Sequence, residues 1–354
     1  MSRDVLILNI DAFAKKNVMQ IRELEAEGWT FTIVANDLRA NSRQVFDAQG
    51  FARSRLILLK GSIAKLTTAW RVLRERRYHH VEFYAVSHLS IPYLIMLKLL
   101  RQKFLVVERG DISVISGYNP VVRAGMKLAY RLADLILYKE VYMAEPLRLL
   151  CSTPLAMVPN CVDERPVADG AARDIDFLWV NRIIPQRRAE WATAAMADER
   201  LADRSLLMLG LEERATLESD IANGQERLRA AAGRNIELRG FLDPEPLYRR
   251  ARYFCLPSTI VFGNNSMLEA MAAGVVPVVT EAPGVELIVE DGVNGIITPF
   301  DREAYREGVV RAAALGDEQW RAMSRKAVET VREKYSPQAW TSLMSDVYAR
   351  IGAA

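Results

Sequence analysis

Residues 253–300 read YFCLPSTIVFGNNSMLEAMAAGVVPVVTEAPGVELIVEDGVNGIITPF, and this stretch decides the fold of the chain. An apolar run over residues 253–256 predicts a buried parallel strand that stops at Pro257. Residues 266–273 predict a helix that begins among polar residues and ends at Gly274, and residues 275–279 predict the next strand. Together they form one βαβ turn of an α/β sheet, with a loop at the carboxyl end of the first strand.

The loop and the start of the predicted helix have the chemistry of a ligand site. Open α/β sheets bind ligands beyond the carboxyl ends of their strands. The amino end of a helix favours a phosphate group, because its first amides have no partner within the helix. Glu269, early in this helix, can accept hydrogen bonds from the hydroxyls of a ribose. The sequence therefore predicts a nucleotide site around this turn.

The same stretch resembles the nucleotide-binding signature of retaining glycosyltransferases of family 4. The match runs through FGNNSMLEAMAAGVVPVV and continues in APGVELIVEDGVNGIITP. Glu269 falls on the second glutamate of that family's E-x7-E motif, whereas the first glutamate is missing. Counting back from Glu269 places Val261 there, and aligning on FG places Ile260 there. Neither side chain can act as a carboxylate.

The resemblance implies the GT-B fold, an α/β architecture with two Rossmann-like domains facing a cleft and a C-terminal helix that crosses back to the first domain. We expect an acceptor-side domain at residues 1–163, a linker at 164–174, a nucleotide-sugar-binding domain at 175–334 and the crossing helix at 335–354. The linker, ERPVADGAARD, is polar and contains Pro and Gly, as domain boundaries often do. It follows VPNCVD, which resembles the family's PNGVD with Cys161 in place of the glycine.

The bulk composition fits a soluble two-domain enzyme. A chain of 354 residues suffices for two α/β domains, and 50% of them are hydrophobic and 26% charged. The net charge of +3 is too small to indicate nucleic acid as a partner. The three cysteines have no metal-ligand spacing, and there are only three histidines. We therefore expect no metal, and no cofactor beyond a nucleotide-diphosphate sugar as donor substrate.

The expected location is the cytoplasm. Residues 1–4 lead directly into the apolar run VLILNI, which is too short for a signal peptide, and the apolar segment 88–100 is about half as long as a membrane span. A basic face in the first half of the chain can hold the protein to the anionic inner face of a membrane, although a solvated surface is the more common role for any single residue. The basic residues are Arg71, Arg74, Arg76, Arg77, Lys98, Arg101, Lys103, Arg123, Lys127 and Arg131.

Charged residues that follow the predicted strand at 104–107 indicate the acceptor side of the cleft. Such groups at the carboxyl end of a buried strand face a cleft more often than a core. Members of the family place a catalytic histidine or acidic residue at about this point, so Glu108 and Asp111 are catalytic candidates, and Arg109 and Asp111 are acceptor-side candidates. His88, after the strand predicted at 81–85, is a further acceptor-side candidate. An ion-paired loop explains the same charges, and both explanations remain open.

Two arginines after the strand predicted at 176–180 add to the donor site. The segment NRIIPQRR at 181–188 resembles the family's GRLxxxKG, with Arg182 on the arginine and Arg187 on the lysine of that motif. Fixed cations stabilise the charge of a leaving nucleoside diphosphate without a metal, and the resemblance implies this catalytic role for both arginines. Asn181 and Arg188 replace the two glycines of the motif.

The remaining donor-binding candidates lie in loops of the second domain. Main-chain groups near Gly240 and Phe241 are expected to meet the base, by resemblance to the family's VxFxGxV segment. Glu269 is expected to hold the ribose. The candidates for contact with the phosphates and the donor sugar are Ser258, Gly263, Asn264, Asn265 and Ser266.

These observations predict a glycosyltransferase that moves a hexosyl or related sugar from a nucleotide-diphosphate sugar to an acceptor hydroxyl. The resemblance implies retention of anomeric configuration and independence of metal. A glycan or lipid-linked acceptor in surface polysaccharide or lipopolysaccharide assembly fits a cytoplasmic protein with a basic first domain. The missing glutamate leaves an alternative open, a non-catalytic GT-B subunit that binds a nucleotide sugar or supports a partner enzyme. A GT-B sugar-nucleotide epimerase shares the fold but needs an acid–base set of glutamates and histidines that the sequence does not supply.

Overall fold

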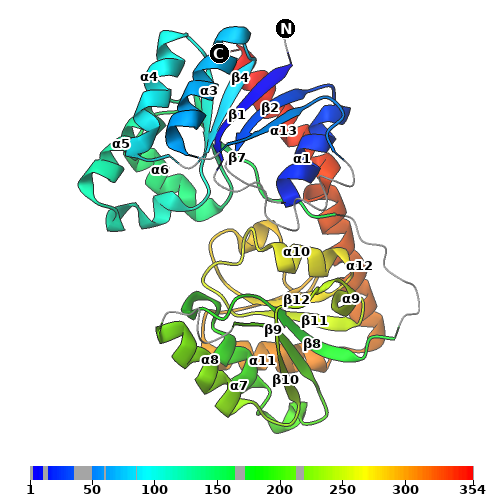
Figure 1. Cartoon of the computed structure of the whole chain (residues 1–354). Helices are drawn as coiled ribbons and strands as arrows, with labels where there is room; N and C mark the ends of the chain where they lie inside the picture. The colour runs from blue at the N-terminus through cyan, green and yellow to red at the C-terminus, as the bar shows by residue number, and fades with distance from the viewer. Residues whose placement is uncertain are drawn as a thin grey trace. The chain divides into compact units, whose positions relative to one another are not determined.

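The computed structural model describes residues 3–10, 15–35, 50–59, 61–84, 86–163, 172–212 and 219–353. The chain divides into two compact units (Figure 1). Unit 1 comprises Met1–Pro159 together with Trp340–Ala354, and unit 2 comprises Asn160–Ala339. Most of the predicted linker, residues 164–171, lies outside the described residues.

The described strands of unit 1 form one parallel sheet in the order β3-β2-β1-β4-β5-β6-β7. Their bounds are β1 Asp4–Ile10, β2 Thr30–Ala35, β3 Arg55–Leu58, β4 His80–Tyr84, β5 Phe104–Val107, β6 Leu135–Tyr138 and β7 Leu155–Met157. The apolar runs in these strands have the composition of a sheet that is covered on both faces, and every residue of β5 is buried.

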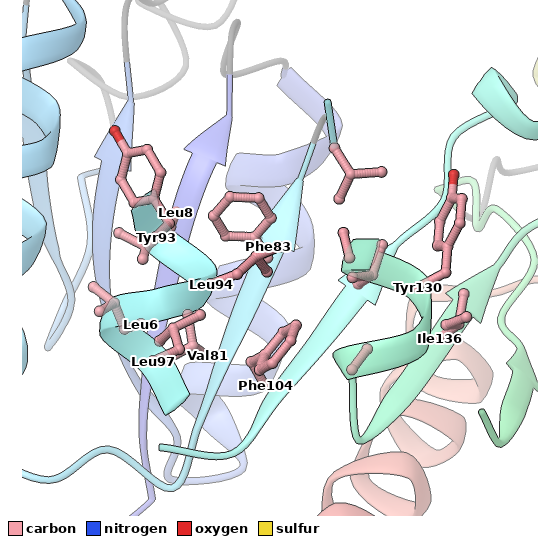
Figure 2. Close-up of a cluster of buried hydrophobic side chains, with 14 of the residues drawn as sticks. Leu6, Leu8, Val81, Phe83, Tyr93, Leu94, Leu97, Phe104, Tyr130 and Ile136 are labelled. Carbon is pink, nitrogen blue, oxygen red and sulfur yellow. The ribbon is translucent and has the colours of Figure 1, made fainter. Parts of the chain in front are cut away.

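Helices cover both faces of the sheet of unit 1. On one face α3, α4 and α5 lie side by side, and their inner residues join the core drawn in Figure 2, which includes Leu94 and Leu97 of α4 and Tyr130 of α5. On the other face lie α1 and the last helix, α13 (Figure 1). The α-helices of the unit are α1 Lys15–Ala26, α3 Ser62–Glu75, α4 Ile91–Leu99, α5 Pro120–Leu132, α6 Ala144–Leu150 and α13 Pro337–Ala353, and the short 3-10 helices are η1 His88–Ser90, η2 Asp111–Gly117 and η3 Val141–Met143.

Polar contacts fasten the end of α13 to unit 1. The Tyr348 hydroxyl donates a hydrogen bond to Oε1 of the buried Glu82 in β4. Lys103 Nζ donates to the carbonyls of Ile351 and Gly352, at 3.1 and 3.2 Å. These carbonyls lie in the last turn of the helix, where a cation is favoured by the helix dipole. The last helix therefore packs with the first sheet, although it follows the second in sequence.

The described strands of unit 2 also form a parallel sheet, in the order β10-β9-β8-β11-β12-β13. The strands are β8 Ile175–Val180, β9 Leu206–Leu211, β10 Ile236–Gly240, β11 Ala251–Leu256, β12 Val276–Thr280 and β13 Ile296–Thr298. The α-helices are α7 Ala189–Ala195, α8 Ser219–Ala231, α9 Glu245–Tyr248, α10 Asn265–Ala272, α11 Arg302–Ala313 and α12 Asp317–Lys334, and the 3-10 helices are η4 Pro185–Arg187, η5 Glu199–Leu201 and η7 Val285–Leu287.

The predicted turn at 253–279 is confirmed, since β11, α10 and β12 follow one another and the two strands pair in parallel. The sequence of residues 301–335 predicts two charged helices, and these are α11 and α12. The sequence also predicts a short helix at 247–252, and this prediction is wrong at its end. The helix α9 stops at Tyr248, because Ala251 already pairs with Ile175 in the sheet. Among the described helices, none is both long and apolar enough to span a bilayer.

The packing beneath α13 can be tested through His79. Its Nδ1 lies 2.9 Å from Nδ1 of His80, and burial, followed by the neighbouring His80 and Lys103, lowers the pKa of His79 to about 4. The unfolded chain binds this proton with an ordinary pKa of about 6.5. It therefore holds more protons than the folded chain between pH 4 and 6.5, and stability falls as pH drops through that window.

Between pH 7 and pH 4.5, we expect the free energy of unfolding of His79→Gln to fall by about 1 kcal/mol less than that of wild type. This value is reduced for the solvent access of the His79 ring. The measurement is the free energy of unfolding in urea at both pH values. Equal losses in the two proteins would show that His79 is not the titrating group.

Candidate functional site

The predicted donor residues of unit 2 lie along one edge of its sheet. The described strands are parallel, so the loops after β10, β9, β8 and β11 leave the sheet at the same edge, in that order. The loop after β8 is residues 181–188, and the loop after β11 is residues 257–264. Glu212 follows β9 and Phe241 follows β10. Segments far apart in the sequence therefore meet at one place.

An asparagine caps α10 and ties it to the loop after β8. Asn264 Oδ1 accepts a hydrogen bond from the Met267 amide at 2.8 Å, and Asn264 Nδ2 donates to Asn181 Oδ1 at 2.8 Å. The Asn264 side chain is buried, so both bonds are shielded from water. The amides of Asn265 and Ser266 belong to the first turn and have no carbonyl acceptor within the helix. The site thus presents amide groups to an anion at the helix start.

Gly263 turns the chain into this cap. Its φ of 75° lies in the left-handed region, which favours glycine. Its carbonyl accepts a hydrogen bond from Asn160 Nδ2 at 3.1 Å. Asn160 belongs to the predicted PNCVD segment, which is therefore fastened to the loop that precedes α10.

One stripe of α10 stays partly exposed and carries Asn265, Ser266 and Glu269. The other described residues of the helix are buried, which fixes the direction of this stripe. The fully buried Tyr248 donates its hydroxyl to Glu269 Oε2 at 3.3 Å. The carboxylate is thereby positioned about one turn from the helix start, beside the predicted anion site.

Arg187 reaches from the loop after β8 to the loop after β11. Its Nη1 donates to the Ile260 carbonyl at 2.6 Å and lies 3.3 Å from the Ser258 hydroxyl. Arg188, the next residue, has a φ of 46°, so the chain adopts a left-handed turn where the family motif has glycine. This turn leads directly into α7. A main-chain carbonyl and a hydroxyl therefore hold the guanidinium at this edge of the sheet.

Arg182 is held more loosely. Its Nε donates to Glu212 Oε1 at 3.2 Å, and 63% of its side chain is exposed. An exposed ion pair of this kind contributes less than about 1 kcal/mol, so the arginine can change partner at little cost. Glu212 follows the strand β9, which pairs with β10 through Leu211 and Gly240. Phe241, next to Gly240, is 64% exposed and offers an aromatic face at the same edge.

The two residues that align with the missing glutamate, Ile260 and Val261, help to build the loop after β11. The Val261 side chain is fully buried, and Ile260 contributes its carbonyl to Arg187. Ser258 is also fully buried, and its hydroxyl donates to the Gln186 and Ile260 carbonyls at 3.1 and 2.9 Å. Contact between Ser258 and a donor stays a prediction, while its observed bonds hold the loop together.

Glu108 of unit 1 is a buried acceptor of hydrogen bonds. Its Oε1 accepts from the amides of Gly110 and Ile112 at 2.7 and 3.1 Å, and its Oε2 accepts from the Tyr130 hydroxyl. Both oxygens therefore organise the turn after β5. The predicted catalytic role stays untested, and the contacts give Glu108 a structural role.

A small pocket of about 40 Å³ lies at the carboxyl edge of the unit 1 sheet, beside α13. Arg109 lines it, together with Glu82 and Tyr84 of β4 and Trp340 of α13. Tyr84 donates to Glu82 Oε2 at 3.0 Å, and burial, followed by the charge of Glu82, raises the pKa of Tyr84 well above its ordinary value. Glu82 was missed by sequence reasoning, although a glutamate inside the apolar run HVEFY is a signal of a buried charge with partners.

The other acceptor-side candidates are less defined. His88 begins η1, whose capping box joins Ser87 and Ser90. A Cβ on Gly125 of α5 would meet His88 Cα at 2.4 Å, so a glycine is required where α5 packs on η1. His88 does not line the pocket at Arg109. The side chain of Asp111 lies outside the described residues, and its predicted role stays a prediction.

Comparisons with known proteins agree with this architecture. Residues 174–314 match the family model described as glycosyl transferases group 1. No curated protein matches the sequence. A glycosyltransferase from Rickettsia africae superposes with a TM-score of 0.75 at 12% identity, over 99% of this chain and 98% of the other.

Two further solved structures are similar over nearly their whole length. Sucrose-phosphate synthase from Thermosynechococcus elongatus has a TM-score of 0.73 at 17% identity, over 99% of both chains. The Anabaena protein HepE, in complex with UDP and glucose, has a TM-score of 0.74 at 15% identity, over 98% of this chain and 99% of the other. The predicted GT-B fold is confirmed by these neighbours. The domain match in unit 2 bears out the predicted enzyme class, a glycosyltransferase.

The link between Asn264 and Asn181 predicts a stability difference between two variants. We expect Asn264→Ala to lower the free energy of unfolding by about 1–2 kcal/mol, because the cap and the bond to Asn181 are both lost. Asn264→Asp keeps the cap acceptor, and Asn181 Nδ2, which has no hydrogen-bond partner among the described residues, can turn to donate to it. In urea unfolding, the free energy of unfolding of Asn264→Asp should therefore fall by less than half as much as that of Asn264→Ala. Similar losses in the two variants would contradict this role.

Proposed function

We propose that the protein transfers a sugar from a nucleotide-diphosphate sugar to an acceptor hydroxyl, with retention of anomeric configuration and without a metal. The observation that carries the proposal is the meeting of Arg187, Arg182, the start of α10 and Glu269 at one edge of the unit 2 sheet. This edge lies within the segment that matches glycosyl transferases group 1. HepE, a structural neighbour, was solved with UDP and with UDP-glucose, which supports a donor of this class.

The chemistry assigns a different task to each group. The diphosphate gains negative charge as its bond to the sugar breaks, and fixed cations and amides stabilise that charge more than the ground state. Arg187 is suited to this task because the Ile260 carbonyl and the Ser258 hydroxyl hold its guanidinium at this edge. The exposed Arg182 can close on the diphosphate from the other side. Glu269 is suited to the ribose, because Tyr248 orients its carboxylate.

Asn265 is our candidate for the sugar end of the donor. In the E-x7-E pattern a carboxylate serves that end, and here the loop offers a buried valine and a carbonyl that holds Arg187. Asn264 is committed to the cap and to Asn181. The Asn265 side-chain oxygen is buried and has no hydrogen-bond partner among the described residues. A hydroxyl of the donor sugar would satisfy it.

On the acceptor side, we propose that unit 1 binds a glycan or lipid-linked acceptor through the region of Arg109 and Asp111. A cationic side chain there suits an acceptor with an anionic group. The proposed setting is surface polysaccharide or lipopolysaccharide assembly on the cytoplasmic side of a membrane, with peripheral contact to anionic lipid. The basic character of the first half of the sequence supports this setting.

The proposal predicts separate kinetic effects for two residues of the site. Arg187→Ala should lower kcat by roughly 100-fold to 1,000-fold, because its contact with the leaving group strengthens in the transition state. Glu269→Gln should mainly raise KM, because contact with the ribose is similar in the ground and transition states. The measurement is release of nucleoside diphosphate from a panel of nucleotide sugars with an acceptor present.

Arg311→Ala is the matched control, since Arg311 is a surface arginine of the same unit that pairs with Asp291. It should leave both constants unchanged. Wild-type activity in Arg187→Ala, with the fold intact by circular dichroism, would rule out the diphosphate role. Nucleotide-sugar binding without turnover on any acceptor would favour the non-catalytic subunit instead. The configuration of the product, read by NMR, tests retention.

A further inference from the structure

Large aliphatic side chains gather on the outer surface of η1, α4 and α5 in unit 1. Five of them are between 40% and 72% exposed. We call this surface the α4–α5 face, and define it by the aliphatic residues Leu89, Ile95, Leu99, Val121 and Leu128 and the basic residues Lys98, Arg101, Lys127 and Arg131. Exposed apolar residues that occur singly are normal, whereas a set on adjacent helices marks an interaction surface.

The fold makes this set one surface. The helix α4 packs against α5, and η1 packs against both. Residues on the inner sides of both helices belong to the core shown in Figure 2, so the remaining sides point away from the sheet. On α5, residues 121, 124, 128 and 131 are exposed and follow helical spacing. The close approach of Gly125 to His88 brings Leu89 of η1 next to this helix.

The charge on this surface has one sign. The sequence contains no Asp or Glu between residues 86 and 107, and none between residues 112 and 133. Lys98, Arg101 and Lys127 are exposed and form no ion pair with any residue whose side chain is described. Arg131 donates to the Leu150 carbonyl at 3.4 Å, which leaves its charge unneutralised.

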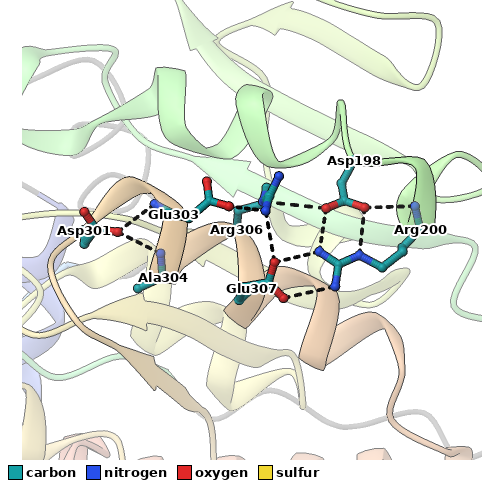
Figure 3. Close-up of polar contacts among 7 residues, drawn as sticks. All are labelled: Asp198, Arg200, Asp301, Glu303, Ala304, Arg306 and Glu307. Carbon is teal, nitrogen blue, oxygen red and sulfur yellow. Dashed lines mark hydrogen bonds and ion pairs between the residues drawn. The ribbon is translucent and has the colours of Figure 1, made fainter.

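Several surface arginines of unit 2 have acidic partners. Figure 3 shows Arg200 between Asp198 and Glu307, at 2.7 Å from each, with Arg306 paired to the same two carboxylates. Arg250 and Arg311 also have acidic partners. The exposed Lys98, Arg101 and Lys127 therefore differ from these four arginines in having no acidic partner among the described side chains.

Arg101 is a further cation of this face and has an unusual backbone conformation. Its φ of 48° lies in the left-handed region, at a helix end where glycine is the residue that fits without strain. A long cationic side chain at this position costs stability. The chain nevertheless places a cation there, beside Leu99.

We propose that the α4–α5 face docks the protein on an anionic lipid bilayer. The aliphatic side chains would enter the headgroup boundary while the lysines and arginines meet lipid phosphates, a combination that suits this interface and not nucleic acid, which has no apolar layer to receive Leu99. The inference deepens the membrane contact of the proposed function, and it rests on that function only for the view that the bilayer carries the acceptor.

The test uses the full-length protein and sedimentation with vesicles of phosphatidylcholine, with and without phosphatidylglycerol. Wild type should bind the anionic vesicles and be released by salt. Each neutralised cation should weaken binding to the anionic vesicles about fivefold. The double variant Lys98→Gln/Lys127→Gln should therefore bind them about 25-fold more weakly than wild type. The control Lys326→Gln/Arg332→Gln removes the same charge from α12 of unit 2 and should bind as wild type. Equal binding by both double variants, equal binding to neutral vesicles, or no vesicle binding would overturn the proposal.

Arg101→Gly separates docking from stability. We expect this variant to bind anionic vesicles about fivefold more weakly while its Tm rises by about 1–3 °C, because the strain is removed. Weaker binding with a lower Tm would point to damage of the fold, and unchanged binding would remove Arg101 from the face. Release of nucleoside diphosphate with a soluble acceptor should not change in any of these variants. Vesicle binding without any nucleotide-sugar turnover would therefore contradict the proposed function and still support docking through the α4–α5 face.

Discussion

The proposed donor site depends on the two hydrogen bonds of the Asn264 side chain. One bond caps α10 and the other holds Asn181 at the start of the loop that carries both arginines. Because the side chain is buried, neither bond competes with water, and the helix start and the loop are fixed relative to each other. Asn181 stands where the family motif has glycine. The substitution thus supplies a partner for the cap, which explains how an asparagine is accommodated there.

The contacts of Arg187 also bear on the missing first glutamate of the E-x7-E motif. A glutamate in the loop after β11 would place a negative charge beside Arg187, whereas here the arginine meets the Ile260 carbonyl and the Ser258 hydroxyl. These two groups hold the guanidinium at the edge of the sheet. For the sugar end of the site we propose Asn265, whose buried side-chain oxygen has no hydrogen-bond partner among the described residues. We therefore expect the protein to differ from E-x7-E enzymes in its choice of donor sugar more than in its treatment of the diphosphate.

Much of the fold and of the proposed site could be predicted from the sequence, because the segments concerned are contiguous in the chain. The turn from β11 to β12 and the loop at 181–188 are contiguous segments with strong apolar runs, so their elements and edge position follow from the chain itself. The roles of Ser258 and Glu108 could not be predicted, because their partners Gln186 and Tyr130 come from other elements. Glu82 was missed for the same reason, since its partners Tyr84 and Tyr348 meet only when α13 packs on the first sheet. The one-signed charge of α4 and α5 is visible in the sequence, but the outward position of Leu99 and Leu128 is given only by the fold.

The most direct measurement of the central claim is a crystal structure with a bound nucleoside diphosphate. The account predicts the distal phosphate within hydrogen-bond distance of the Asn265 and Ser266 amides and of the Arg187 guanidinium, with the ribose hydroxyls on Glu269. A diphosphate bound elsewhere in the chain, or bound at this edge without contact to the Arg187 guanidinium, would contradict it.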